Sequence, residues 1–318
     1  NLKTYVAGHR GLVGSAVMRE LSGAGYTHIV TRTHRELDLT RQEEVDSFFA
    51  SERPEAVVLA AARVGGILAN DTYKAEFIYQ NMMIAANVIH AAYKSGVKKL
   101  VNLGSSCIYP KFAPQPMKEE HLLTGILEPT NEPYAIAKIA AIKLCRYYNQ
   151  QFGTNFVSAM PTNLYGPGDN FDLESSHVLP ALIRKAHEAK VAGHESFPAW
   201  GDGSPKREFL YVEDLARAIR FLLEEVDAAV LAELTPDTFV NVGTGEDLSI
   251  KELAELVCDV VGFEGRIDWD TSKPTGAPRK LMDVSTINRL GWKASTPLRE
   301  GVRKTYEWFV ARERGEAE

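Results

Sequence analysis

The chain has 318 residues, of which 45% are hydrophobic and 25% are charged, an ordinary composition for a globular protein. Its 36 basic and 42 acidic residues leave a formal net charge of −6, so no global positive field would attract nucleic acid or an anionic membrane. At about 150 residues per domain, this length predicts one large domain or two unequal ones.

The sequence argues against membrane insertion and secretion. The longest wholly apolar run, residues 56–62, is far shorter than the roughly 18 residues of a membrane span. Gly8 follows so soon after the first residue that no apolar stretch of a signal peptide fits before it. The three cysteines, Cys107, Cys145 and Cys258, lack the spacing of a zinc site or a disulfide framework. We therefore expect a reduced, soluble, cytoplasmic protein with no metal, no nucleic-acid partner and no membrane partner.

The first half alternates between short β-branched runs and stretches whose apolar residues recur at helical spacing. The predicted strands span residues 4–7, 28–31, 56–60, 99–103 and 155–160. The predicted helices between them span residues 14–24, 41–51, 75–94 and 134–151. This alternation predicts an α/β fold of the Rossmann type, with a doubly wound parallel sheet covered by helices on both faces.

Three glycines, Gly8, Gly11 and Gly14, directly follow the first predicted strand and open a helix. Glycine lets the backbone approach a pyrophosphate closely, and a helix N-terminus offers free N–H groups to it. A helix-packing turn could also carry three glycines, but the strand before them and the helix after them favour a phosphate loop. We therefore predict a dinucleotide site here.

The second predicted strand leads to Arg32 rather than to the carboxylate that binds the ribose of NAD. The guanidinium group of Arg32 could hold a 2′-phosphate by two hydrogen bonds, and Arg10 inside the glycine loop could add a second charge. The alternative, a solvated surface arginine, applies more readily to Arg35 than to Arg32. The pattern predicts a preference for NADP.

After residue 160, loops rich in proline, glycine and asparagine interrupt the alternation of strands and helices. We expect residues 1–160 to form the NADP-binding domain and residues 161–318 to form mainly a smaller, mixed α/β substrate-binding domain. Parts of residues 205–245 should rejoin the first domain, because residues 209–223 have the pattern of a strand followed by a helix. Further helices are predicted at residues 246–261 and 297–312.

Two predicted helices begin with the signature of a capping box, Thr40 with Glu43 and Ser249 with Glu252. Residues 241–245, Asn-Val-Gly-Thr-Gly, resemble a second phosphate loop but lack its third glycine. We predict a plain turn between a strand and a helix there.

Tyr134 and Lys138 lie four residues apart, on one face of a predicted helix. A lysine in this place can lower the pKa of the phenol, so that the tyrosine exchanges a proton with a carbonyl or hydroxyl group near neutral pH. Such a pair is common by chance, but Ser105 follows the end of a predicted strand, where α/β sheets bind their ligands. We expect the Ser105 hydroxyl to hydrogen-bond the reacting oxygen.

The glycine loop, the strand end at Ser105 and the Tyr134–Lys138 pair together resemble the extended short-chain dehydrogenase/reductase superfamily. Nearly the whole chain is similar to the GDP-L-fucose synthase family, and the likeness is carried by residues 7–11, 63–67, 104–110, 160–166 and 278–280. The resemblance implies a homodimeric enzyme that epimerises C3 and C5 of GDP-4-keto-6-deoxy-D-mannose and reduces its C4 with NADPH. The apolar faces of residues 75–94 and 134–151 are candidates for the dimer contact, although packing against the sheet explains the same pattern.

The resemblance also implies a role for each catalytic residue. Cys107 matches the base and His177 the acid of the two epimerisations, whereas Ser105, Tyr134 and Lys138 match the group that serves the reduction. Without the resemblance, Cys107 would be taken for a small buried hydrophobic residue and His177 for a loop or cap residue.

The predicted binding residues come from the glycine loop, the second strand and the family pattern. The cofactor contacts are Gly8, Arg10, Gly11, Leu12, Val13, Gly14, Arg32, Asp38, Leu39, Ala61, Tyr134, Lys138, Pro161, Asn163, Leu164 and His177. The substrate contacts are Asn163, Val178, Lys185, Trp200, Arg207 and Lys280. The three cations suit a diphosphate and Trp200 offers an aromatic wall, but Lys185 stands where the family pattern leads us to expect arginine.

Two other functions fit parts of the pattern. A nucleotide-sugar 4-epimerase or dehydratase of the same fold would recycle its cofactor, which is typically NAD, and the arginines after the second strand argue against it. A non-catalytic dinucleotide sensor would have no need of a complete set of proton-transferring residues.

Overall fold

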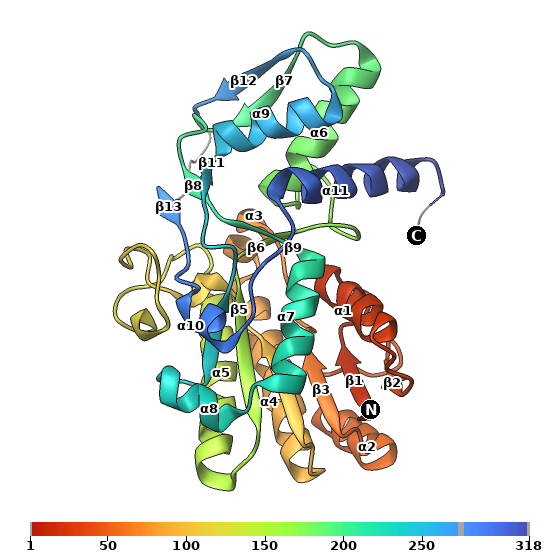
Figure 1. Cartoon of the computed structure of the whole chain (residues 1–318), viewed down its shortest axis with the longest axis vertical. Helices are drawn as coiled ribbons and strands as arrows, with labels where there is room; N and C mark the ends of the chain where they lie inside the picture. The colour runs from red at the N-terminus through yellow and green to blue at the C-terminus, as the bar shows by residue number, and fades with distance from the viewer. Residues whose placement is uncertain (1, 273–276, 317–318) are drawn as a thin grey trace.

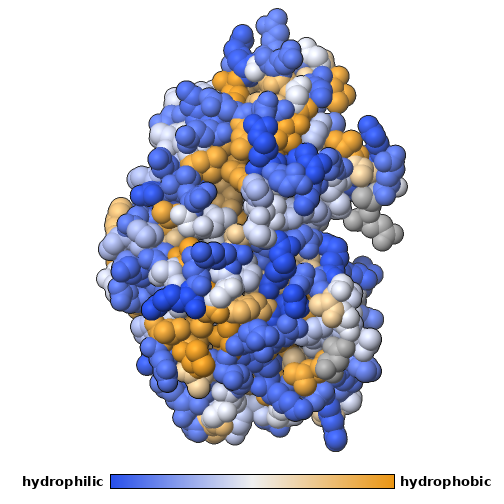
Figure 2. Space-filling model, in the orientation of Figure 1, coloured by the Kyte–Doolittle hydropathy of each residue, from blue (hydrophilic) through white to orange (hydrophobic). Residues whose placement is uncertain are grey.

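The computed structural model describes residues 2–272 and 277–316. Figure 1 shows a lower part built around a parallel sheet and an upper part in which helices α6, α9 and α11 lie near strands β7 and β12. The face in Figure 2 is covered largely by hydrophilic residues. Among the helices of the described residues, none combines the length and the hydropathy needed to cross a bilayer.

The central sheet contains six parallel strands in the order β10-β5-β4-β3-β1-β2. Their bounds are Thr4–Ala7 for β1, Ile29–Val30 for β2, Ala56–Leu59 for β3, Lys99–Leu103 for β4, Phe156–Pro161 for β5 and Phe239–Val242 for β10. The chain runs outward from β1 to β2 and then places β3 on the other side of β1. The order of the strands therefore reverses between β1 and β3, and ligands bind beyond the carboxyl ends of strands at such a point.

Helices cover both faces of this sheet. On one face, α1 (Leu12–Gly23) packs beside α7 (Val212–Glu225), and on the other α2 (Gln42–Glu52) and α5 (Glu132–Phe152) flank α4 (Lys74–Lys94). Neighbouring residues of a strand point to opposite faces, so Val6 and Val58 belong to one hydrophobic cluster, whereas Tyr5 and Val57 belong to the other. This arrangement confirms the predicted doubly wound α/β fold.

The remaining elements complete the upper part, the lower part and the connections between them. They are α3 (Ile67–Thr72), η1 (Ser106–Ile108), η2 (Glu119–His121), β6 (Asn163–Tyr165), α6 (Val178–Ala192), β7 (Ser196–Trp200), β8 (Lys206–Arg207), β9 (Phe209–Tyr211), α8 (Ala228–Leu234), β11 (Leu248–Ser249), α9 (Ile250–Val261), β12 (Arg266–Asp270), β13 (Arg279–Lys280), α10 (Ser285–Leu290) and α11 (Leu298–Glu313). A separate hydrophobic cluster joins α6, α9 and α11 to β7, and includes Ile183, Phe197, Leu253 and Phe309.

Of the two predicted helix caps, the one at Ser249 is present and the one at Thr40 is not. Ser249 caps α9 as expected, since its hydroxyl accepts a hydrogen bond from the Glu252 N–H at 3.1 Å and the Glu252 carboxylate accepts one from the Ser249 N–H at 2.7 Å. The cap predicted at Thr40 is wrong. Helix α2 starts after Arg41, and the Thr40 hydroxyl donates to Asp38 at 2.7 Å instead.

The segment 241–245 differs from its prediction in one respect. It leaves β10 after Val242 and leads to the short strand β11, so it connects two strands, and α9 begins only after β11.

Candidate active site

The glycine loop lies at the end of β1, where the strand order reverses. Gly8 has a φ of +83°, and a Cβ atom on it would lie 2.7 Å from the backbone nitrogen of Ala61, just past the end of β3. A Cβ atom on Gly14 would lie 2.0 Å from the carbonyl oxygen of Gly8. Gly11 is the N-cap of α1, so the first N–H groups of that helix, at Leu12 and the residues after it, are available to an anion. The loop therefore fits the pyrophosphate of a dinucleotide.

Arg32 lies just beyond β2, but its guanidinium group already has partners. It forms an ion pair with Glu52 at the end of α2, donates to the carbonyl oxygen of Thr31 at 2.8 Å and lies 5.3 Å from the centroid of the Phe48 ring. Arg10 is exposed in the glycine loop. A 2′-phosphate bound here would share Arg32 with Glu52.

Two predicted cofactor contacts, Asp38 and Leu39, lie on the chain that connects this arginine to α2. Leu39 is buried, and Asp38 accepts hydrogen bonds from the N–H and the hydroxyl of Thr40 at 3.0 and 2.7 Å. A pocket of about 450 Å³ opens beside this segment, between Leu37 and Phe48.

Strand β4 and helix α5 bring the predicted reduction residues together. The Nζ atom of Lys138 donates to the carbonyl oxygen of Leu103 at 2.7 Å and lies 5.7 Å from the centroid of the Tyr134 ring. Ser105 is the N-cap of η1, where its hydroxyl accepts a hydrogen bond from the Cys107 N–H at 3.4 Å. The thiol of Cys107 is close enough to influence the ionisation of both Tyr134 and Lys138.

Burial controls the protonation of this group. It raises the pKa of the Tyr134 phenol, and the Cys107 thiol adds to that effect. It lowers the pKa of Lys138 to about 8, which the thiol partly opposes. The lysine was expected to lower the pKa of the phenol, but in this structure burial raises that pKa. The phenol consequently keeps its proton at neutral pH, as a proton donor must.

The predicted epimerisation residues are also neutral at rest. It raises the pKa of Cys107, against a hydrogen bond with Ser105 and the positive charges of Lys280 and Lys138. His177 is the solvent-exposed N-cap of α6, and the protein around it lowers its pKa by desolvation. Within the described residues, no hydrogen bond joins His177 to Cys107. The thiol is thus protonated and the imidazole neutral at rest, which is the reverse of the states that a base at Cys107 and an acid at His177 require.

Three of the predicted substrate residues lie close together. Lys280 of β13 stands opposite Arg207 of β8 in a parallel pair, and Asn163 of β6 donates its side-chain amide to the carbonyl oxygen of Glu208 at 2.8 Å. Burial lowers the pKa of Lys280, and the Arg207 charge lowers it further. The Cys107 thiol also influences the ionisation of Lys280, so this cation pair lies near the predicted catalytic group.

The other predicted substrate residues belong to α6 and β7. Lys185 donates from Nζ to the carbonyl oxygen of Pro198 at 3.0 Å. Val178 is the first residue of α6 and Trp200 the last of β7, and their side chains are 37% and 60% exposed.

The last two predicted cofactor residues lie where the chain leaves the central sheet, between β5 and β6. Pro161 ends β5 and is buried, whereas Leu164 lies in β6.

A buried polar junction, which was not predicted from the sequence, anchors the segment after Cys107. Asn241 of β10 accepts a hydrogen bond from the Tyr109 hydroxyl at 2.5 Å, donates from Nδ2 to the Met117 carbonyl at 2.9 Å, and has its own N–H bound by the Glu119 carboxylate at 3.0 Å. Asn241 is fully buried. A lone amide inside an apolar strand was the available signal, because buried polar groups need partners.

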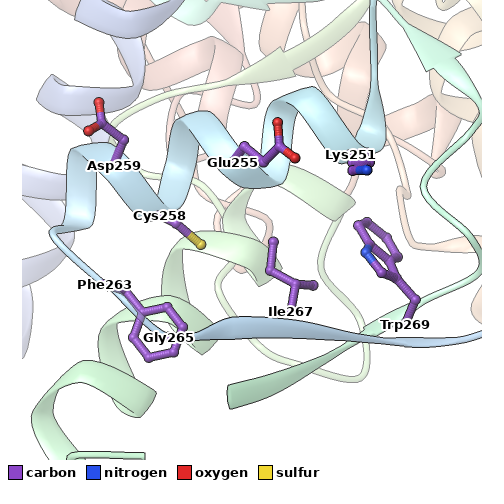
Figure 3. A pocket seen from close by; sticks show the side chains of 8 residues that line it. All are labelled: Lys251, Glu255, Cys258, Asp259, Phe263, Gly265, Ile267 and Trp269. Carbon is purple, nitrogen blue, oxygen red and sulfur yellow. The ribbon is translucent and has the colours of Figure 1, made fainter. Parts of the chain in front are cut away.

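A pocket of about 460 Å³ lies elsewhere, between α9 and β12. Figure 3 shows Cys258 of α9 above Ile267 and Trp269 of β12 in this pocket. None of the predicted site residues lines it, so we exclude it from the candidate active site.

Comparison with known proteins agrees with this geometry. Residues 4–243 match the NAD dependent epimerase/dehydratase family, and the chain belongs to that family. It is 59% identical over 308 residues to GDP-L-fucose synthase 1 of Arabidopsis thaliana, which covers 97% of this chain and 93% of that protein. It is 54% identical over 309 residues to GDP-L-fucose synthase of Escherichia coli strain K12, with 97% and 96% of the two chains covered.

A solved structure adds a cofactor to these similarities. The GDP-mannoheptose C4 reductase of Campylobacter jejuni, with NADP bound, is 40% identical, has a TM-score of 0.88 and matches over 98% of each chain. The comparisons confirm the predicted family and a dinucleotide-dependent enzyme, and they agree with NADP(H) as the cofactor.

Proposed function

We propose that this protein converts GDP-4-keto-6-deoxy-D-mannose to GDP-L-fucose by epimerisation at C3 and C5 and NADPH-dependent reduction at C4. The observation that carries the proposal is that Cys107 lies in the same group as Ser105, Tyr134 and Lys138. Its N–H donates to the Ser105 hydroxyl, Lys138 joins the end of β4 to the Tyr134 ring, and the positive charge of Lys280 acts on the Cys107 thiol. One site then combines a group for carbon-acid chemistry, a proton donor for reduction and a cation for the diphosphate. The identities of 59% and 54% to two GDP-L-fucose synthases support this assignment.

In the epimerisations, the C4 ketone makes the protons on C3 and C5 acidic. Cys107 removes each proton from one face of the sugar, and His177, in the protonated form that is its minor species at rest, supplies a proton to the other face. Burial keeps most of the Cys107 population protonated, and the ammonium groups of Lys280 and Lys138 favour the thiolate fraction that reacts.

In the reduction, NADPH supplies a hydride to C4 when it is bound. Tyr134 donates its proton to the C4 oxygen, which the Ser105 hydroxyl holds in place. Lys138, fixed by the Leu103 carbonyl, keeps a positive charge beside the phenol as the phenol loses its proton.

We assign the two ligands to different parts of the chain. Residues 1–160, with parts of 205–245, hold the dinucleotide: the glycine loop binds its pyrophosphate, Arg10 and Arg32 its 2′-phosphate, and the segment at Asp38 its adenine. Residues 161–318 bind most of the GDP-sugar. Its contacts are Asn163, Val178, Lys185, Trp200, Arg207 and Lys280.

We also assign a homodimer, in which α4 and α5 of one copy face those of a second copy. These two helices pack against each other and leave large apolar side chains exposed. Tyr79 and Met82 of α4 are 62% and 42% exposed, and Tyr147 and Ile136 of α5 are 53% and 39% exposed. Such a surface is typical of a contact between copies.

The decisive experiment incubates the protein with GDP-4-keto-6-deoxymannose in deuterated buffer while NADPH absorbance is followed and the product is identified by NMR. Oxidation of NADPH with deuterium at C3 and C5 of GDP-L-fucose is the expected result. Controls replace NADPH by NADH and the substrate by a UDP-keto-sugar.

Each other outcome selects a different function. Reduction without deuterium would indicate a C4 reductase, the activity named for the Campylobacter jejuni relative. Exchange without NADPH oxidation would indicate an epimerase. No reaction of either kind would favour the dinucleotide sensor.

A further inference from the structure

The carboxylate of Glu208 joins two distant segments of the chain beside Arg207. It is completely buried. Its Oε1 atom accepts the N–H groups of Thr244 and Gly245 at 2.7 and 2.8 Å, and its Oε2 atom accepts the N–H of Met282 at 2.9 Å. One side chain therefore fixes the backbone after β10 and the backbone after β13.

These bonds reinforce a very short strand pair. Strands β8 and β13 have two residues each, so their ladder offers few hydrogen bonds to hold Arg207 opposite Lys280. Glu208 directly follows Arg207, and Met282 lies two residues after Lys280. The Glu208–Met282 bond thus continues the contact between the two strands at the point where the ladder ends.

The Glu208–Met282 bond reinforces the pairing of β8 with β13. This pairing brings two positively charged side chains next to each other. Arg207 and Lys280 are paired across the two strands, and the charge of Arg207 acts on Lys280. The two like charges therefore repel each other until an anion binds between them. A rigid backbone keeps them in place without the anion, which reduces the cost of organising them when the ligand arrives.

We propose that Glu208 is a positioning residue, which sets the separation of Arg207 and Lys280 for the diphosphate of a guanosine diphosphate sugar. This inference rests on the proposed function, because that function places the diphosphate at these two cations. Glu208 itself touches neither ligand and acts through the backbone that it binds.

Gly243 offers a second way to displace this carboxylate. A Cβ atom on Gly243 would lie 2.1 Å from Oε1 and 2.9 Å from Cδ of Glu208. The φ angle of Gly243 is outside the left-handed region, so alanine at this position would not strain the backbone. Its Cβ atom would instead clash with the Glu208 carboxylate.

The test measures GDP and NADPH binding to the full-length protein by isothermal titration calorimetry, together with KM and kcat for the keto-sugar. Glu208→Gln keeps the size of the side chain but places an NH2 group where an oxygen accepts, so at least one backbone N–H loses its partner. The dissociation constant for GDP should rise roughly 10- to 100-fold, as expected for loss of a hydrogen bond to a charged group. NADPH affinity should be unchanged, and KM should change more than kcat.

Gly243→Ala should reproduce this loss with the carboxylate still present. In a Glu208→Ala background the same glycine substitution should have no further effect on GDP affinity, because the contact that it creates is gone. The glycine variant also provides the measurement if Glu208→Gln does not fold.

Asp214→Asn is the matched control. Asp214 is also buried, and it accepts the N–H groups of Ser295 and Thr296 at 3.2 and 2.9 Å, but the segment that it holds carries no proposed site residue. This variant should lower the melting temperature and leave GDP affinity unchanged.

The outcomes separate this inference from the proposed function. A wild-type protein that does not bind GDP would overturn both. If the wild type binds GDP, then wild-type affinity in Glu208→Gln, or an equal loss of affinity in Asp214→Asn, would overturn the positioning role alone.

Discussion

The Nζ atom of Lys138 lies 2.7 Å from the carbonyl oxygen of Leu103, the last residue of β4. This hydrogen bond ties α5, which carries the proposed proton donor Tyr134, to the strand end that leads to Ser105. The bond also places the buried ammonium group 5.7 Å from the centroid of the Tyr134 ring.

The reduction step should lose rate as the pH rises through about 8. Burial lowers the pKa of Lys138 to about 8, so above that pH the side chain loses its proton and its positive charge. The phenol does not titrate in this range, because burial raises the pKa of Tyr134. Single-turnover NADPH oxidation between pH 6 and 10 measures the effect. Lys138→Arg should move the decline to higher pH, and an unchanged profile would contradict the assignment.

Tyr134→Phe should stop reduction and spare epimerisation. Removing a general acid typically costs about 10²- to 10⁴-fold in rate, and NADPH oxidation should fall by that amount. Deuterium should still enter C3 and C5 of the keto-sugar, because Cys107 and His177 remain. Loss of both signals with intact NADPH binding would mean that the phenol serves both steps.

Cys107→Ser should abolish deuterium exchange without changing NADPH affinity, since a hydroxyl group ionises far less readily than a thiol and supplies almost no conjugate base near neutral pH. The chain supplies two matched controls. Cys145 and Cys258 are buried thiols outside the site, and their serine variants should exchange at the wild-type rate. Wild-type exchange in Cys107→Ser would show that another group is the base.

The exchange rate should rise with pH, because burial raises the pKa of Cys107 and the reactive thiolate is a minor species at neutral pH. Lys280 opposes that shift with its positive charge. Lys280→Met should therefore raise the pKa of the thiol further and move the alkaline rise of the exchange rate to higher pH. The measurement uses saturating substrate, so that weaker diphosphate binding does not mask the shift.

Arg32→Ala should raise KM for NADPH much more than KM for NADH. The guanidinium group is held beside the expected 2′-phosphate position by Glu52 and Phe48. Arg35→Ala provides the control, because Arg35 is exposed nearby and should matter little. Equal effects of Arg32→Ala on the two cofactors would remove the basis for NADP selectivity.

Tyr79→Glu on α4 should halve the mass measured by light scattering after gel filtration, because a charge would be buried in the proposed dimer contact. Phe112→Glu is the control, since Phe112 is 75% exposed but lies outside α4 and α5. A wild-type protein that is already monomeric would exclude the dimer.

The parts of the structure that depend on local pattern were predictable. The strands from β1 to β5, the helix after the glycine loop and the Ser249 cap follow from periodicity and from residues a few positions apart. The Thr40 cap failed because Asp38, two residues earlier, binds the same hydroxyl more directly.

The parts that depend on distant pairing were not predictable. The sequence identifies Arg207 and Lys280 as cations, but it does not reveal that they are paired in two short strands of the folded protein. The buried hydrogen bonds of Asn241 were likewise not predictable, because its partners come from three other segments of the chain. The protonation states of Cys107 and Tyr134 also escaped prediction, because burial depends on the complete fold.

The position of β10 in the central sheet has a consequence for how the chain reaches its native state. This strand pairs with β5 but follows it in the chain only after β6, α6, β7, β8, β9, α7 and α8 have been synthesised. Until then, β5 presents an unpaired edge of buried, apolar residues, which is a template for pairing with another chain. During synthesis on the ribosome, the nascent chain is thus most vulnerable to aggregation in the interval between the emergence of β5 and that of β10.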